Sequence, residues 1–169
     1  MAASTDNYYV GKAIITFKKT GAMSATDLGN IPECEFSFNI EKLDHFSSRA
    51  GVKSKDKSVI ISKSATIRLV MEEITAENMA LALGGTVTTN SDGSKTFGLM
   101  TDNTTEGELT ITGTNEIGNQ VNWVGDVSFA PSGSFNPISD EWGSVEATCE
   151  VLVDGYGNFG LFTVVPQAT

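Results

Sequence analysis

The sequence predicts a mainly β protein of antiparallel strands with one flanking helix. Seventeen glycines against four prolines, among many Thr, Ser and Asn residues, indicate frequent tight turns. Two long stretches alternate apolar and polar residues, and only one short stretch has the composition of a helix. The 169 residues are enough for one domain but not for a second full domain. We therefore expect a single antiparallel β-sandwich or barrel-like domain over residues 1–169.

The alternating stretches are residues 33–41 and 59–72. Alternation of this kind predicts half-buried strands, each with one wet face. Both stretches are long enough to pair with each other as an extended hairpin. The polar positions of the alternation, which we call the polar parity, are Glu33, Glu35, Ser37, Asn39 and Glu41 in the first stretch and Ser62, Ser64, Thr66 and Arg68 in the second.

Residues 44–57, with the sequence DHFSSRAGVKSKDK, connect these strands and contain almost no apolar residues. We expect a long loop here, and such loops within a domain are usually functional or disordered. One reading is a solvated loop. The other is a contact in which its cations, Arg49, Lys53, Lys55 and Lys57, meet an acidic surface of another copy. That contact would be heterologous, and heterologous contacts generate rings or open filaments.

The remaining elements are predicted from local signals. Residues 1–7 form a polar arm that we expect to be mobile in the free subunit. The helix covers residues 75–84, because Thr75 can cap the segment AENMALAL and Gly84-Gly85 can end it. Asp92-Gly93 marks a hairpin turn, and residues 154–158 form another turn. Further strands are expected at residues 8–18, 108–112, 121–130, 145–153 and 159–165.

The net charge of −10 is concentrated in the second half of the chain. Residues 86–169 carry eleven Asp and Glu residues against one cation, Lys95, whereas the first half is balanced. Tight binding of a nucleic acid needs clustered Lys and Arg residues, and an acidic surface repels phosphate. A protein that lets DNA pass without holding it could benefit from this repulsion.

The sequence predicts no catalytic residue, metal site or cofactor. The single histidine, His45, lies in the polar loop and makes a poor general base. Neighbouring carboxylates such as Glu72 and Glu73 would point to opposite faces of a strand, and turn chemistry accounts for the scattered Asp and Asn residues. No phosphate-binding glycine motif opens a helix. Trp123 and Trp142, with several Phe residues, are interpreted as core packing rather than as a stacking platform.

Cys34 and Cys149 stand 115 positions apart, without a neighbouring Cys or His that would make a zinc or redox motif. We expect both thiols to be unpaired, as is usual in a reducing compartment. No N-terminal signal pattern is present, and no run approaches 18 consecutive apolar residues. No membrane partner is therefore predicted.

The segment NYYVGKAIITFKKTG, followed by DLGNIPECEFSFNIEKLDHFSSRAGVKSKDKSVIISKSATIRLVMEEITAENMALALGG, resembles the first half of siphophage major tail tube proteins. The resemblance covers residues 7–85. Its most specific part is a fixed order of features: the long strand, LDHFSSR-x-G-x-x-x-KDK, the second strand and the T-x-E-N helix. The assignment of the second half of the chain to this family depends on its strand pattern and on its belonging to the same domain.

The resemblance implies a virion structural protein that is synthesised and assembled in the bacterial host cytoplasm. Six subunits would form a ring, and stacked rings would form a hollow tube through which double-stranded DNA passes as transient cargo. Its partners would be other copies of itself and the tape measure, tail terminator and distal tail proteins of the same phage. The inter-ring contacts would be Asp44, His45, Phe46, Ser47, Ser48, Arg49, Gly51, Lys53, Lys55, Asp56 and Lys57. If the polar parity of the hairpin faces the channel, its nine residues line the lumen.

Two rivals remain open at this point. A monomeric tail decoration or carbohydrate-binding module could use the same kind of sandwich, and it would stay monomeric or form small closed oligomers. An enzyme using paired carboxylates is the second rival, although the sequence supplies neither a positioned base nor a nucleophile motif.

Overall fold

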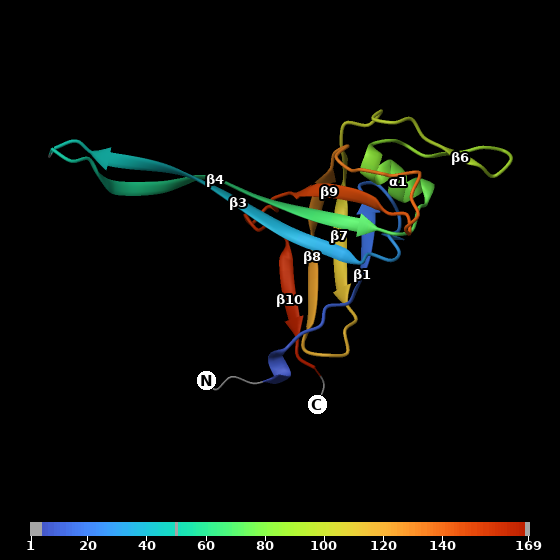
Figure 1. Cartoon of the computed structure of the whole chain (residues 1–169), viewed down its shortest axis with the longest axis horizontal. Helices are drawn as coiled ribbons and strands as arrows, with labels where there is room; N and C mark the ends of the chain where they lie inside the picture. Colours follow the sequence, from blue (N-terminus) through green and yellow to red (C-terminus); the bar gives the residue numbers. More distant parts are fainter. Residues whose placement is uncertain (1–4, 50, 168–169) are drawn as a thin grey trace.

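The computed structural model describes residues 5–49 and 51–167. Within these residues, eight strands form one large antiparallel sheet with a short helix beside it, and two short strands form a separate sheet (Figure 1). The expected mainly β class with one flanking α-helix is confirmed. The elements are the 3-10 helix η1 (Thr5–Asn7), β1 (Ala13–Lys19), β2 (Thr26–Asp27), β3 (Glu33–Ser47), β4 (Ser54–Met71), α1 (Ala76–Leu83), β5 (Thr88–Thr89), β6 (Lys95–Thr96), β7 (Thr105–Gly113), β8 (Gln120–Phe129), β9 (Val145–Val151) and β10 (Leu161–Val165).

The main sheet has the strand order β2-β1-β7-β8-β9-β4-β3, and β10 pairs with β8 outside this path. The sheet forks at β8, because residues 120–124 of that strand pair with β10 while residues 127–129 pair with β9. The fork lets β9, β4 and β3 fold over the layer made by β1, β7 and β8, as in a sandwich. The sheet is not closed into a barrel within the described residues.

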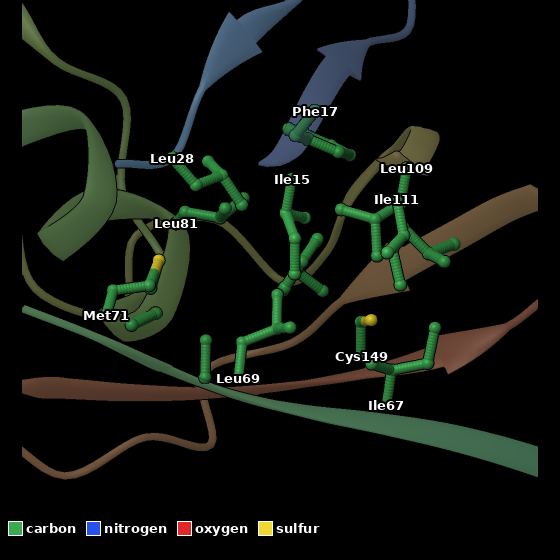
Figure 2. Close-up of a cluster of buried hydrophobic side chains, with 14 of the residues drawn as sticks. Ile15, Phe17, Leu28, Ile67, Leu69, Met71, Leu81, Leu109, Ile111 and Cys149 are labelled. Atoms are coloured by element: carbon green, nitrogen blue, oxygen red, sulfur yellow. The ribbon is translucent and has the colours of Figure 1, made fainter. Parts of the chain in front are cut away.

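The core lies between these two layers (Figure 2). In β7 and in the last residues of β4, buried residues alternate with less buried ones, so that one side of each strand faces inward. Ile67, Leu69 and Met71 from β4 meet Leu109 and others from the opposite layer, and Figure 2 shows them converging. The largest fully buried side chains are Trp123, Phe129, Ile67, Leu69, Met71, Leu109, Val127, Val145 and Cys149.

Helix α1 begins and ends where the capping signals predict. The Thr75 hydroxyl oxygen accepts a hydrogen bond from the Asn78 amide at 3.1 Å, which satisfies one of the free N–H groups of the first turn. Gly84 takes the left-handed conformation with φ of 73°, and its N–H donates to the Ala80 carbonyl. Asn78 is buried and donates its side-chain amide to the carbonyl oxygens of Leu28 and Glu73. The helix is therefore tied to the β2 end of the sandwich.

Several strand limits differ from those expected. β1 starts at Ala13 rather than at residue 8, because the preceding segment runs beside the 115–119 loop, where the Val10 amide donates to the Ile117 carbonyl. β10 starts at Leu161, directly after Gly160, whose φ of 73° is not a strand conformation. Of the polar arm expected at residues 1–7, residues 1–4 lie outside the described residues and Thr5–Asn7 form a 3-10 turn.

Both cysteines are free, Cys149 in the core and Cys34 at a more exposed position on β3. Desolvation by the surrounding groups raises the pKa of the Cys34 thiol to about 11 and that of Cys149 to about 12. Because the thiolate is the reactive form, both thiols should react slowly in the folded protein at neutral pH.

We expect a thiol titration under denaturing, non-reducing conditions to count two groups per chain, and a count of zero would contradict this.

Candidate assembly surface

β3 and β4 continue as a two-stranded arm well beyond the sandwich (Figure 1). We define the hairpin arm as residues 38–47 of β3 and 54–64 of β4. The expected loop at residues 44–57 is therefore wrong in extent, since the strands reach Ser47 and resume at Ser54. Beyond Leu43 the cross-strand pairs are mostly polar, and two register shifts, at Glu41/Lys42 and His45/Phe46, absorb the extra residues of β4.

The register of β3 with β4 brings the predicted channel-lining residues together on one face. Directly opposed residues of antiparallel strands share a face. Glu35 lies opposite Arg68, and Ser37 lies opposite Thr66. Farther out, Asn39 lies opposite Ser64, while Glu41 lies opposite Ser62 and accepts its hydroxyl at 2.9 Å. Eight of the nine residues thus form four opposed pairs, and the ninth, Glu33, joins them through Arg68.

The other face of the same strands is apolar, and only part of it is covered. Near the sandwich, Ile67 and Leu69 of β4 are completely buried. Farther out, Phe38 and Ile40 of β3 lie on the same face as Phe36, but 70% and 50% of their surfaces are exposed. At and beyond the first register shift the arm exposes further large apolar side chains, namely Leu43, Phe46, Val59, Ile60 and Ile61, of which the opposed pair Leu43 and Val59 lies on the same side as Glu41. Exposed apolar surface of this size marks an interaction site in a soluble protein.

Aromatic side chains connect the base of the arm to the sandwich. The Phe36 ring lies 5.3 Å from the Trp123 ring and 5.2 Å from the Phe162 ring, centre to centre. Phe36 also stacks with Phe38 at 6.5 Å. Edge-on and offset contacts of this kind stabilise aromatic clusters beyond simple burial. The cluster fixes the direction in which the arm leaves the sandwich.

Both long edges of the arm lack a partner strand within the part of the chain that the structure describes. β3 is the last strand of the sheet and pairs only with β4. β4 pairs with β9 only over residues 66–71, so the same side of residues 54–65 is open. An unpaired edge exposes a row of backbone donors and acceptors that can pair with another chain. The arm therefore offers two complementary strand edges.

Arg68 is held by two carboxylates at the base of the arm. Its guanidinium forms two hydrogen bonds of 2.8 Å to Glu146 on β9, and Nη1 lies 2.8 Å from Glu33. The hydrogen bonds from Arg68 lower the pKa of Glu146, and the same contacts raise the pKa of Arg68. Such a bidentate pair fixes geometry as well as charge. Arg68 thus ties β4 to β9 where the arm begins.

We expect Arg68→Ala to lower the melting temperature at pH 7, and to lower it less at low pH. Because folding lowers the pKa of Glu146 below its ordinary 4.5, the pair stabilises the folded state above that pH. This stabilisation is lost as the pH falls through the folded-state pKa. Thermal unfolding of wild type and variant from pH 7 to pH 3 measures it, and an effect of equal size throughout would contradict the assignment.

Fewer cations at the end of the arm are available for a contact with another copy than the sequence indicates, because Lys55 is paired within the arm. Lys55 Nζ lies 2.9 Å from Asp44, which also accepts the Ser58 hydroxyl at 2.6 Å, and these contacts lower the pKa of Asp44. His45 Nδ1 lies 2.6 Å from Asp56. Of the predicted contact residues, Asp44, His45, Phe46 and Ser47 lie on β3, Lys55, Asp56 and Lys57 lie on β4, and Ser48, Arg49, Gly51 and Lys53 lie in the connection.

Trp142 lies elsewhere than expected. Trp123 is buried in the core, but 95% of the Trp142 surface is exposed, so core packing is wrong for Trp142. The sequence around it, Asp140, Glu141 and Gly143, has no alternation of apolar and polar residues, and this absence is the signal that Trp142 is not part of a core strand.

The described residues contain no group of three His, Cys, Asp or Glu side chains placed to hold a metal ion. No helix in the described ranges is long and apolar enough to cross a membrane.

Residues 8–111 match the family described as "Protein of unknown function UCP028589". No curated protein matches the chain. Among solved structures, the chain is similar to one from "Tail of empty GTA particle computed with helical refinement, C6 symmetry", with 15% identity, 90% of this chain and 95% of that chain covered, and a TM-score of 0.49. It is also similar to one from "Virion of native gene transfer agent (GTA) particle", with 14% identity, coverage of 97% and 99%, and a TM-score of 0.45. The family match spans more than half of the chain and contains the whole hairpin.

Proposed function

The chain belongs to the UCP028589 family, and we propose that it is a structural protein that polymerises into the hollow tail tube of a long-tailed bacteriophage. The observation that carries the proposal is the hairpin arm, with two unpaired edges and two faces of opposite chemistry. A free monomer leaves both edges and the apolar face in water. Contacts between copies would cover them, and the sequence resemblance to tail tube proteins implies the same kind of assembly.

The topology supports side-by-side joining of arms. β3 and β4 run antiparallel within one arm. When two arms stand side by side in the same orientation, β4 of one copy is therefore antiparallel to β3 of the next, and the open edges can form the same ladder. This contact is heterologous, and it closes into a ring when the rotation between copies allows. Ring closure would remove both exposed edges of the arm, as in a barrel.

A barrel of arms would place one face toward the channel. We assign the polar face to the lumen, where the four opposed pairs would present hydroxyl, amide and carboxylate groups to passing DNA. Arg68 would not grip phosphate there, because Glu146 and Glu33 already engage its guanidinium. The apolar face, with Phe38 and Ile40, would pack outward against the sandwiches of neighbouring copies. The resemblance of the sequence to siphophage tail tube proteins supports six copies per ring and stacking of rings through the end of the arm.

Negative-stain electron microscopy of the purified chain tests the proposal. Hollow tubes of uniform width, or rings that stack as the concentration rises, are the expected result. Light scattering of the same sample follows the growth of the particles. A protein that remains monomeric at every concentration would contradict the proposal and favour a decoration or carbohydrate-binding module.

We expect the purified chain to bind duplex DNA negligibly at physiological salt. The net charge is −10, and Arg68, Lys55 and Lys95, three of its eleven cations, are engaged by carboxylates of the same chain. Few phosphate contacts remain to release counterions from DNA. A mobility-shift assay at the physiological ionic strength of about 0.15 M measures the affinity for DNA. Micromolar affinity would show that the chain holds DNA rather than letting it pass.

A further inference from the structure

The connection between β8 and β9 exposes two large apolar side chains beside two carboxylates. We define the acidic loop as residues 136–143. Ile138 and Trp142 expose 86% and 95% of their surfaces, and Asp140 and Glu141 lie between them in the sequence. The loop contains no Lys or Arg. Trp is among the residue types most enriched at the contacts that dominate interface energetics, so an exposed Trp beside a second exposed apolar residue marks a candidate contact surface.

The structure holds this loop in place. The Ile138 amide donates to the Asn136 side chain at 3.4 Å, and the Glu141 amide donates to the Ser139 hydroxyl at 3.0 Å. At its start, Phe135 bridges to Val145 and packs against the core. Local side-chain to backbone bonds of this kind fix turns. The two apolar side chains are therefore presented outward by a defined conformation.

The end of the hairpin arm has the complementary character. We define the hairpin tip as Ser48, Arg49 and Gly51–Lys53. Its one large apolar residue, Val52, exposes 83% of its surface and lies in the sequence between two cations, Arg49 three residues before it and Lys53 directly after it. Neither cation has a salt-bridge partner among the described residues. An apolar centre with a cationic rim matches an apolar centre with an anionic rim.

The hairpin tip and the acidic loop cannot meet within one chain. The arm carries the tip to one extreme of the long axis, and the β8–β9 connection lies beside α1 at the other end of the molecule (Figure 1). Ser132, at the start of that connection, donates its amide to the Ala82 carbonyl of α1 at 3.4 Å. A contact between the two surfaces therefore joins different copies head to tail.

We propose that the acidic loop is the docking site for the hairpin tip of a second copy, with Val52 packing against Ile138 and Trp142 and the cations facing Asp140 and Glu141. The proposal rests on the proposed tube function and names the acceptor surface of its inter-ring contact. The exposed ion pairs would set register, and the apolar centre would supply most of the affinity.

Cysteine cross-linking in assembled tubes tests the contact. Val52→Cys and Ile138→Cys are combined in a Cys34→Ser background, which removes the exposed native thiol. The matched control pairs Val52→Cys with Met23→Cys, at a fully exposed site outside the acidic loop. Under mild oxidation we expect a ladder of covalent multimers from the first variant and none from the control. Tubes that give no ladder, or equal ladders from both variants, would overturn the docking site while leaving the tube function intact.

Charge reversal supplies the second readout. Arg49→Glu with Lys53→Glu, or Asp140→Lys with Glu141→Lys, should raise the concentration needed for tube growth by up to about fivefold for each exposed pair lost. Combining the two reversals should restore growth. Additive loss without restoration would overturn the contact. If wild type forms no tubes, the tube function fails and the docking site fails with it, a result distinct from tubes that ignore the reversals.

Discussion

Replacing residues 45–57 with an Asn-Gly turn is expected to leave a folded monomer that forms no tubes. Asp44 lies directly opposite Ser58, so a two-residue turn can close the shortened hairpin between them. The replacement removes the whole hairpin tip and residues 54–57, a third of the unpaired β4 edge at residues 54–65. Growth of long tubes should stop, because both the side-by-side ladder and the contact between rings lose their outer parts.

The fold should survive because the core lies elsewhere. None of the buried core residues falls between 45 and 57, and the β3–β4 ladder over residues 33–44 remains. We expect the melting temperature to change by no more than about 4 °C, equivalent to about 1 kcal/mol for a chain of this size. Circular dichroism reports the fold, and size-exclusion chromatography with light scattering reports assembly.

A matched control shortens a different exposed hairpin. Thr89 and Lys95 pair in the β5–β6 ladder, and replacing the residues between them with Asn-Gly trims a polar turn away from the arm. This variant should still form tubes. A folded chain that lacks residues 45–57 and still forms long tubes would show that the outer arm is only a solvated extension.

Elements whose signals are local can be predicted from the sequence. The caps at Thr75 and Gly84 identified α1, and the alternation around Phe36 and Ile67 identified the two long strands. The outer arm cannot be predicted in this way, because it is held by polar contacts such as the hydrogen bond from Lys55 to Asp44, and its sequence resembles a solvated loop when no partner strand is known. Cross-strand pairing depends on register, and register depends on bulges that no local pattern reveals.

The sequence also cannot separate a core from an interface. Phe38 has the same parity as Phe36, yet the sandwich covers only the inner residue, because the strand outruns the domain. β10 poses the same problem, since its apolar residues read as a core strand but Leu161, Phe162 and Val164 are exposed. Apolar side chains that pack within a chain and those that pack between chains follow one pattern. Only the placement of the strands distinguishes them.

Ile40→Asp is expected to abolish assembly, whereas Asn39→Asp should permit it. The two residues are adjacent on β3 and point to opposite faces of the arm, so each variant adds the same charge at nearly the same height. Both side chains project from the exposed part of the monomer, so neither change should alter its melting temperature by much. If the apolar face packs outward against neighbouring copies, a carboxylate at position 40 becomes buried. The cost is on the order of several kcal/mol per copy, repeated around each ring.

A carboxylate at position 39 would instead face the water-filled channel, beside Glu41 and opposite Ser64. There it stays hydrated and changes only the lumen charge, which salt screens. Light scattering and negative-stain microscopy of both variants at equal concentration compare the two faces directly. Tubes from Ile40→Asp together with none from Asn39→Asp would place the apolar face in the channel and reverse the assignment. Tubes from neither variant would mean that both faces are buried between copies, which an open channel lined by this arm does not allow.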